Sequence, residues 1–394
     1  MSISLTGAHT LGKLTSFLKV ALLVLALHTL TGCAATAPNG TAFVSPGAAP
    51  QIASVTPSYV IAGSGTTALQ IQGANFSPAA TVLVNGEPVT ADVLSASSLV
   101  AVVGGVPVSG TALNVAIARA GQPTASAWVP VLPGGTVATS RNPQVADYSI
   151  SLPQGASVAV DFGADTRYGQ STWAVAAPAG GGVVHVLVAG MKEFSAYHLR
   201  GRIMLGDGSV ILDGDKVFAT GGMDPSVKPS VTSGLQVPAP AGSGIEMFDF
   251  TTSTTQTSVV ATDLNGNIIW YYDPGVAGTY VFPIRALPNG DMLVSIAAPQ
   301  SGFGTSNEIR EVDLAGNTVR SVNFSNVASA LAAQGYSLNL GGFHHDVIAL
   351  PNGHWVTLAY EFRTFQNLPN TSGPTTVRGD AIIDLDTNGQ PVWV

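Results

Sequence analysis

The sequence has 394 residues, enough for two or three domains. Charged residues make up only 10% of it, while Gly and Pro contribute 45 and 25 residues, which is typical of a turn-rich, all-β exported protein. The net charge of −8, without a Lys/Arg cluster, argues against nucleic-acid binding, and a single cysteine excludes an intramolecular disulfide and a cysteine-based zinc or redox site.

The N-terminus has the pattern of an export signal. Lys13 and Lys19 precede an apolar run at 20–30 that is short for a membrane span. The run ends in "LTGC", which resembles the bacterial lipobox, so Cys33 is expected to carry lipid and to begin the mature protein. Ala34 then favours outer-membrane sorting. The alternative is an ordinary signal peptide with an incidental cysteine. We therefore predict a lipoprotein signal peptide at 1–32 and a flexible tether at 33–50.

Residues 51–131 alternate short apolar runs with turns, and "VNGEP" carries the Asn-Gly signal of a tight hairpin. This spacing predicts a small β-sandwich. The marks "TPSYVIAGSG", "LQIQGANF" and "VLVNG" resemble the IPT/TIG immunoglobulin-like family. That resemblance implies a turn glycine at Gly73, a core aromatic at Phe76, and a role as spacer or binding arm. We assign no chemistry to this segment.

Residues 138–235 are again strand-like. The run "VVHVLVAGM" is apolar on both faces, which predicts a central strand with His185 in the core or half-buried. "DFGADTRYGQSTW" and the segment after it resemble the β-domain that precedes the propeller of bacterial arylsulfotransferases. The resemblance allows a homodimer, and it allows His198 and Arg200 to face an acceptor funnel. The alternative makes both of them surface or domain-interface residues.

Residues 236–394 repeat themselves. "VVATDLNGNIIWYYD" is echoed by "EIREVDLAGNTVRSVNF" and "AIIDLDTNGQPVWV", with "LPNG" turns between these units. Asp263, Asp313 and Asp384 are predicted to cap the turns. Trp270 and Trp393 hold like places, so both are expected to pack between sheets.

Two hairpins per unit make a four-stranded sheet, and repeated sheets of this kind indicate a β-propeller. The predicted fold class is all-β: an immunoglobulin-like sandwich, a second β-domain and a partial β-propeller over 236–394.

From about residue 138 onward the chain resembles the bacterial arylsulfotransferase family, above all through "FHHDVIALPNGHWV". The resemblance implies transfer of a sulfuryl group from a phenolic sulfate ester to a phenol acceptor through a sulfohistidine, with ping-pong kinetics and no cofactor. A quinoprotein propeller is the competing family. It lacks support because no vicinal cysteines and no set of calcium ligands can be named.

The same resemblance places a histidine of the "HD" type in the central channel, where it holds the sulfate. We expect this to be His345, with His344 as the alternative on the opposite strand face, and Asp346 orienting a histidine. Arg363 is a weaker channel residue, and His354 is expected to be a turn-flanking surface histidine. A metal site formed by His344, His345 and Asp346 is disfavoured because the side chains of neighbouring residues on a strand point to opposite faces.

The family's later motifs, "D-W-x-H-x-N", an arginine and a nucleophilic "H-D" histidine, do not occur before Val394. Residues 236–394 suffice for about three blades. We therefore expect a fragment of a longer protein, inactive for lack of its nucleophile. The alternative function is a lipid-anchored surface protein whose propeller and Ig-like arm bind a glycan or a protein without catalysis.

Overall fold

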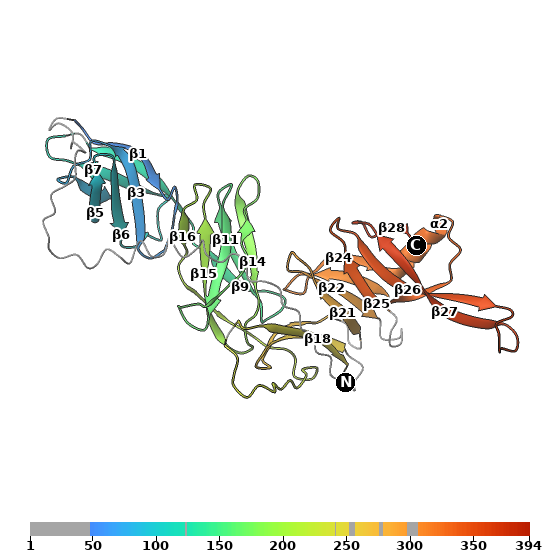
Figure 1. The fold of residues 1–394 in the computed structure, drawn as a ribbon. Helices are drawn as coiled ribbons and strands as arrows, with labels where there is room; N and C mark the ends of the chain where they lie inside the picture. Colours follow the sequence, from blue (N-terminus) through green and yellow to red (C-terminus); the bar gives the residue numbers. More distant parts are fainter. Residues whose placement is uncertain (1–47, 123, 241, 252–256, 276–278, 298–305) are drawn as a thin grey trace. The chain divides into compact units, whose positions relative to one another are not determined.

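A computed structural model describes residues 48–394 except 123, 241, 252–256, 276–278 and 298–305, and the predicted signal and Cys33 lie outside these described residues. The described chain is nearly all β, as the sequence predicts (Figure 1). Within that part, no helix has the length and apolar character needed to cross a membrane. The domain boundaries drawn from the sequence stay predictions.

The first module is a sandwich whose strands follow the hydrogen-bonded order β1-β3-β6-β5-β4-β7-β8-β2. Phe76 is fully buried in its core, as predicted. Gly73 lies inside β3, so the predicted turn glycine is wrong. Glycine is required there because a Cβ would lie 1.9 Å from the Gln51 carbonyl oxygen on the paired strand. The strands are β1 (Gln51–Thr56), β2 (Val60–Ile61), β3 (Thr67–Ala74), β4 (Thr81–Val84), β5 (Glu87–Ser95), β6 (Ser98–Val103), β7 (Ala112–Ala118) and β8 (Ala125–Leu132).

The second module contains the sheet β14-β10-β9 and the sheet β12-β11-β15-β16, to which β13 and β17 add. The strands are β9 (Thr136–Thr139), β10 (Ala146–Leu152), β11 (Ser157–Gly163), β12 (Gln170–Ser171), β13 (Val175–Ala176), β14 (Gly182–Val188), β15 (Ala196–Met204), β16 (Val210–Leu212) and β17 (Lys216–Ala219). The predicted central strand is wrong: β14 is an edge strand, and its burial alternates, so His185 points outward and bonds Asp147 at 3.0 Å.

Three antiparallel meanders follow, which we call the first, second and third repeat sheets. The first repeat sheet holds β18 (Ile245–Thr251), β19 (Thr257–Asp263) and β20 (Ile268–Tyr272). The second holds β21 (Tyr280–Ala286), β22 (Met292–Ala297), β23 (Glu308–Val312) and β24 (Thr318–Asn323), and α2 (Phe324–Ala333) comes next. The third holds β25 (Leu340–Ala349), β26 (Trp355–Phe365), β27 (Thr375–Leu385) and β28 (Pro391–Trp393). Closure of such sheets into a propeller stays a prediction.

The second repeat sheet is buried on both faces. One face packs on the first repeat sheet through residues such as Val294 and Val312. The other packs on the third repeat sheet and α2 through residues such as Leu293 and Ile309. Trp270 is buried, and its indole donates to the Leu314 carbonyl at 2.7 Å, so its predicted packing is confirmed.

The opposite face of the third repeat sheet is only partly covered among the described residues. Ile382 is 50% exposed and Trp393 is 45% exposed. The prediction that Trp393 packs like Trp270 is therefore wrong.

One hairpin turn occurs five times among the described residues of the repeat sheets. In each, the first residue donates its N–H to the carbonyl of the residue four positions on, and a glycine with positive φ donates back to the first carbonyl. This is a type I turn closed by a glycine bulge, in which only glycine takes the left-handed position without strain. The glycines are Gly266, Gly290, Gly316, Gly353 and Gly389.

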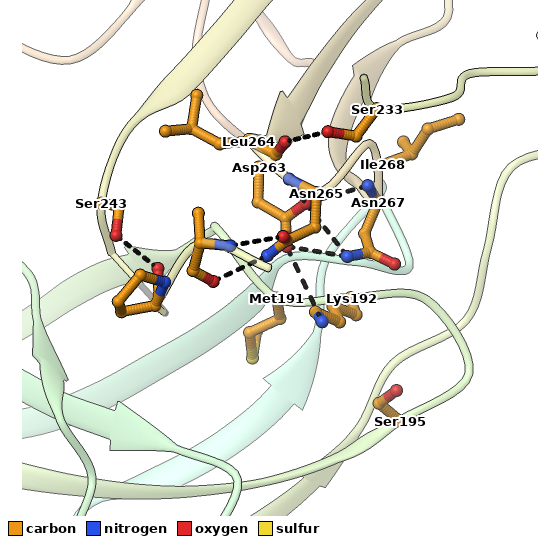
Figure 2. A network of polar contacts seen from close by, with 12 residues as sticks. Met191, Lys192, Ser195, Ser233, Ser243, Asp263, Leu264, Asn265, Asn267 and Ile268 are labelled. Carbon is orange, nitrogen blue, oxygen red and sulfur yellow. Dashed lines mark hydrogen bonds and ion pairs between the residues drawn. The ribbon is translucent and has the colours of Figure 1, made fainter. Parts of the chain in front are cut away.

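Aspartates cap three of these turns. Figure 2 shows the first, in which Asp263 accepts from the N–H groups of Asn265 and Asn267 at 3.0 and 2.9 Å, while Lys192 lies 3.7 Å away. Asp313 caps the turn that contains Gly316, where it accepts the Asn317 N–H at 2.8 Å.

The predicted cap Asp384 is wrong. Asp386 accepts the turn N–H groups of Asn388 and Gln390, because it stands three residues before the glycine, as the other two aspartates do. Asp384 instead binds His354 at 2.9 Å.

Candidate functional site

The paired histidines lie on β25, the first strand of the third repeat sheet, where the chain departs from regular strand geometry. The register of β25 with β26 shifts between His344 and Val347, and His345 has a φ of +52°. This is a β-bulge, which re-aims side chains relative to the strand. Just before it, Gly341 makes room for Phe362, because a Cβ there would lie 2.4 Å from the phenyl ring.

The bulge changes the expected geometry of the pair. A regular strand would send the two imidazoles to opposite faces. Here the ring centroids of His344 and His345 are 5.0 Å apart, in an edge-to-face arrangement. His344 is buried, with 3% exposed, and His345 is exposed. Which of them faces a channel stays a prediction.

His344 is enclosed by aromatic and charged neighbours. Its ring stacks on Tyr360 at 3.9 Å, and the Arg378 guanidinium lies 4.5 Å from the centroid of the same tyrosine ring. Nε2 lies 3.1 Å from an Asp380 carboxylate oxygen, yet neither ring nitrogen has a hydrogen-bond partner among the described residues. We call these five residues, His344, His345, Tyr360, Arg378 and Asp380, the histidine cluster.

Burial sets the charge of His344. It lowers the pKa of this imidazole below its ordinary value, and the nearby Asp380 carboxylate acts in the opposite direction. The His344 imidazole is therefore neutral at neutral pH and keeps one N–H donor and one acceptor. The bulge thus places a buried neutral imidazole beside an exposed one.

The Asp346 carboxylate pairs with an arginine and does not accept an N–H from a histidine, which corrects the direct contact expected from the sequence. Arg285, from β21 of the second repeat sheet, donates to the two carboxylate oxygens at 3.2 and 2.9 Å. One of these oxygens also accepts the N–H of Val347 at 2.9 Å. The carboxylate that approaches His344 is that of Asp380, on β27.

Arg363 lies apart from the paired histidines along β26. It is exposed and pairs with Glu361 at 2.9 Å. At its position β26 pairs only with β27, in a hairpin that extends past β25 and β28 (Figure 1). Its channel role stays a prediction, and the structure shows no contact between its described side chain and the histidine cluster.

The other three histidines in the described part of the chain, His185, His198 and His354, have carboxylate partners. His198 lies on β15 in the second module and contacts Asp215 at 2.7 Å. The neighbouring Arg200 lies over the Tyr168 ring at 4.4 Å. His354, expected on the surface, is instead partly buried against Asp384. Within the described ranges, no group of three or more His, Cys, Asp or Glu side chains is placed to hold a metal ion.

The sequence argument missed Arg285, Tyr360, Arg378 and Asp380. Tyr360 on β26 is directly opposite Asp380 on β27. Arg378 lies two residues before Asp380 on β27 and therefore on the same face of the sheet. A period-two pattern of polar residues in "TTVRGDAII" was the available signal, because alternate residues of a strand share a face.

These features define a class: an all-β protein with an Ig-like sandwich, a second β-module and repeat sheets, the last of which carries a histidine pair on its first strand. Residues 50–127 match the family model of the IPT/TIG domain, and residues 230–394 match that of arylsulfotransferase (ASST). The chain thus carries an IPT/TIG domain and an arylsulfotransferase-family segment, which confirms the two sequence resemblances over these residues, while the resemblance over 138–229 stays a prediction. No curated protein matches the chain.

Several solved structures resemble the chain weakly. An auxiliary nutrient binding protein from Bacteroides thetaiotaomicron is 11% identical, covering 85% of this chain and 71% of its own, with a TM-score of 0.18. A similar protein from Bacteroides ovatus is 12% identical, covering 89% and 76%, with a TM-score of 0.18. The plexin A4 extracellular region is 15% identical, with a TM-score of 0.28, and the match covers 87% of this chain and 30% of the plexin chain. At such TM-scores these likenesses carry no inference.

Proposed function

We propose that this protein takes part in nucleotide-independent transfer of a sulfuryl group from a phenolic sulfate ester to a phenol. His345 binds the sulfate group, with His344 as the alternative. The observation that carries the proposal is the arylsulfotransferase-family match over 230–394, which spans the histidine pair. The exposed imidazole on a bulge, beside a buried neutral one, supports it.

The chemistry follows from the ester. A histidine nitrogen attacks sulfur, the bond between sulfur and the aryl oxygen breaks, and the phenolate leaves with the electron pair. A second phenol then attacks the sulfohistidine, loses its proton and regenerates the imidazole. Negative charge on the equatorial oxygens is stabilised by N–H donors held in place, which is the part we give to His345. No residue of the printed sequence is assigned as the nucleophile.

The test measures binding of the sulfate ester. Binding of 4-nitrophenyl sulfate to the purified protein is followed by calorimetry. His345→Ala is expected to weaken binding at least fivefold. His185→Ala is the matched control, since His185 is another exposed histidine. Equal affinities for wild type and His345→Ala would contradict the assignment.

The export address is a separate part of the proposal. We propose that Cys33 carries the lipid of an outer-membrane lipoprotein and that residues 33–50 tether the module behind it. Metabolic labelling with a radioactive fatty acid is expected to mark the wild type and not Cys33→Ser. Labelling that persists in the variant would contradict the proposed lipid anchor at Cys33. The homodimer stays a prediction, which sedimentation analysis of the purified protein would test.

A further inference from the structure

His345 adopts a backbone conformation that needs support. Its φ of +52° is in the left-handed region, which costs a residue with a Cβ free energy relative to the extended strand on either side. A residue held there reports that the surrounding contacts determine its conformation.

The contacts converge on the next residue, Asp346. Its carbonyl oxygen accepts from the buried Thr357 hydroxyl at 3.1 Å, and its carboxylate accepts the Val347 N–H at 2.9 Å. These two contacts lie within the third repeat sheet. The third contact is the two-point pair with Arg285, which comes from the second repeat sheet.

Arg285 constrains the orientation of the Asp346 carboxylate in addition to pairing with its charge. Its Nε and Nη2 donate to different oxygens of Asp346, and this planar pairing fixes the orientation of the carboxylate. The Asp249 carboxylate, on β18, also raises the pKa of Arg285 by electrostatic attraction, after the larger effect of Asp346. Arg285 is therefore placed by the first strands of the neighbouring repeat sheets.

We propose that Arg285 is a positioning residue for His345: by clamping Asp346 it fixes the bulge that exposes the His345 imidazole and sets it edge-on to His344. The consequence for sulfate binding rests on the proposed function, whereas the positioning itself does not. An ordinary surface ion pair between sheets would leave the histidine geometry unchanged when broken.

The experiment uses the whole protein labelled with ¹³C in its histidine rings. In wild type, nuclear Overhauser contacts are expected between His344 and His345 and between His344 and Tyr360. In Arg285→Gln, the contacts between the two histidines are expected to fall at least twofold while those to Tyr360 persist. Arg285→Lys keeps the charge without the two-point geometry, so it should restore less than half of the loss.

Arg363→Gln is the matched control, because it breaks another exposed arginine–carboxylate pair at 2.9 Å. It should leave all these contacts unchanged. Unaltered contacts between the histidines in Arg285→Gln would overturn the proposal, and so would full restoration by Arg285→Lys. Loss of the Tyr360 contacts as well would overturn it, by showing general unfolding of the sheet.

Binding of 4-nitrophenyl sulfate separates this inference from the proposed function. Arg285→Gln is expected to bind at least fivefold more weakly than wild type. Weaker binding with unchanged histidine contacts would show that Arg285 acts by its charge, against the positioning role. If the wild type does not bind the ester, the proposed function fails, and the histidine contacts alone decide the positioning.

Discussion

Two isoleucines at the same place in successive repeats differ in what covers them. Ile309 and Ile382 each stand four residues before a turn-capping aspartate, yet Ile309 is 0% exposed and Ile382 is 50% exposed. The third repeat sheet covers Ile309, which belongs to the core between the second and third repeat sheets. Substituting both with alanine compares one chemical change in two environments.

The expected costs differ severalfold. Ile309→Ala removes buried methyl groups and leaves a cavity, so it should lower the free energy of unfolding by about 3 kcal/mol. Ile382→Ala removes a side chain that remains half in water and leaves no closed cavity, so it should cost about 1 kcal/mol. Hydrogen-exchange mass spectrometry in increasing urea, on peptides covering β22 to β27, measures the free energy of unfolding of these two sheets separately from the other modules.

The comparison has a clear contrary outcome. Equal costs at the two positions would show that something covers β27 in solution or that burial does not determine the difference. Val356 provides a second check, because it occupies in β26 the place that Leu293 has in β22. Leu293 is fully buried and Val356 is half-buried, so truncation of Leu293 should be the more costly of the two.

Three further predictions concern carboxylates. Partial burial and the neighbouring Glu311 and Asp313 raise the pKa of Asp291 to about 6, so its ionised form destabilises the fold above that pH. Asp291→Asn should raise the melting temperature at pH 7.5 and change it little at pH 4, and an equal gain at both pH values would contradict this. Hydrogen bonds from the turn N–H groups lower the pKa of Asp386, so the stabilisation it provides is present above pH 3.8 and is lost as the pH falls through its lower folded value. Asp386→Asn should therefore lower the melting temperature at pH 7 by an amount that shrinks below pH 3.8, and no loss at pH 7 would refute the cap. Asp213 is buried and accepts from Tyr148, Lys216 and the Gly135 N–H, so Asp213→Ala should cost about 3–5 kcal/mol in urea unfolding of the second module; a cost below about 1 kcal/mol would contradict the network.

The sequence predicted the repeated turns well because their determinants are local. A glycine must occupy the left-handed position, and an aspartate three residues earlier meets the free N–H groups, whatever lies elsewhere in the chain. Asp384 was mistaken for the cap because "DLD" offers two aspartates. The distance to the glycine, three residues at Asp263 and Asp313, selects Asp386.

Features that depend on contacts far along the chain could not be predicted in this way. An apolar run such as "VVHVLVAGM" fits a central strand, but sheet order makes β14 an edge strand. The stacking of His344 on Tyr360 depends on the register of β25 with β26 and on a bulge at a residue that is not glycine. No local pattern in "GGFHHDV" specifies that bulge, because Arg285, which clamps Asp346, lies 61 positions away.

The bulge also changes what the histidine pair can do. On a regular strand the two imidazoles would belong to different faces, and each would have to be explained by its own surroundings. Their ring centroids are 5.0 Å apart, and His345 lowers the pKa of His344, in addition to the larger effect of burial. An anion bound at His345 would therefore act on both rings. We therefore expect sulfate binding, if it occurs on this strand as proposed, to depend on both histidines and on the bulge that brings their rings together.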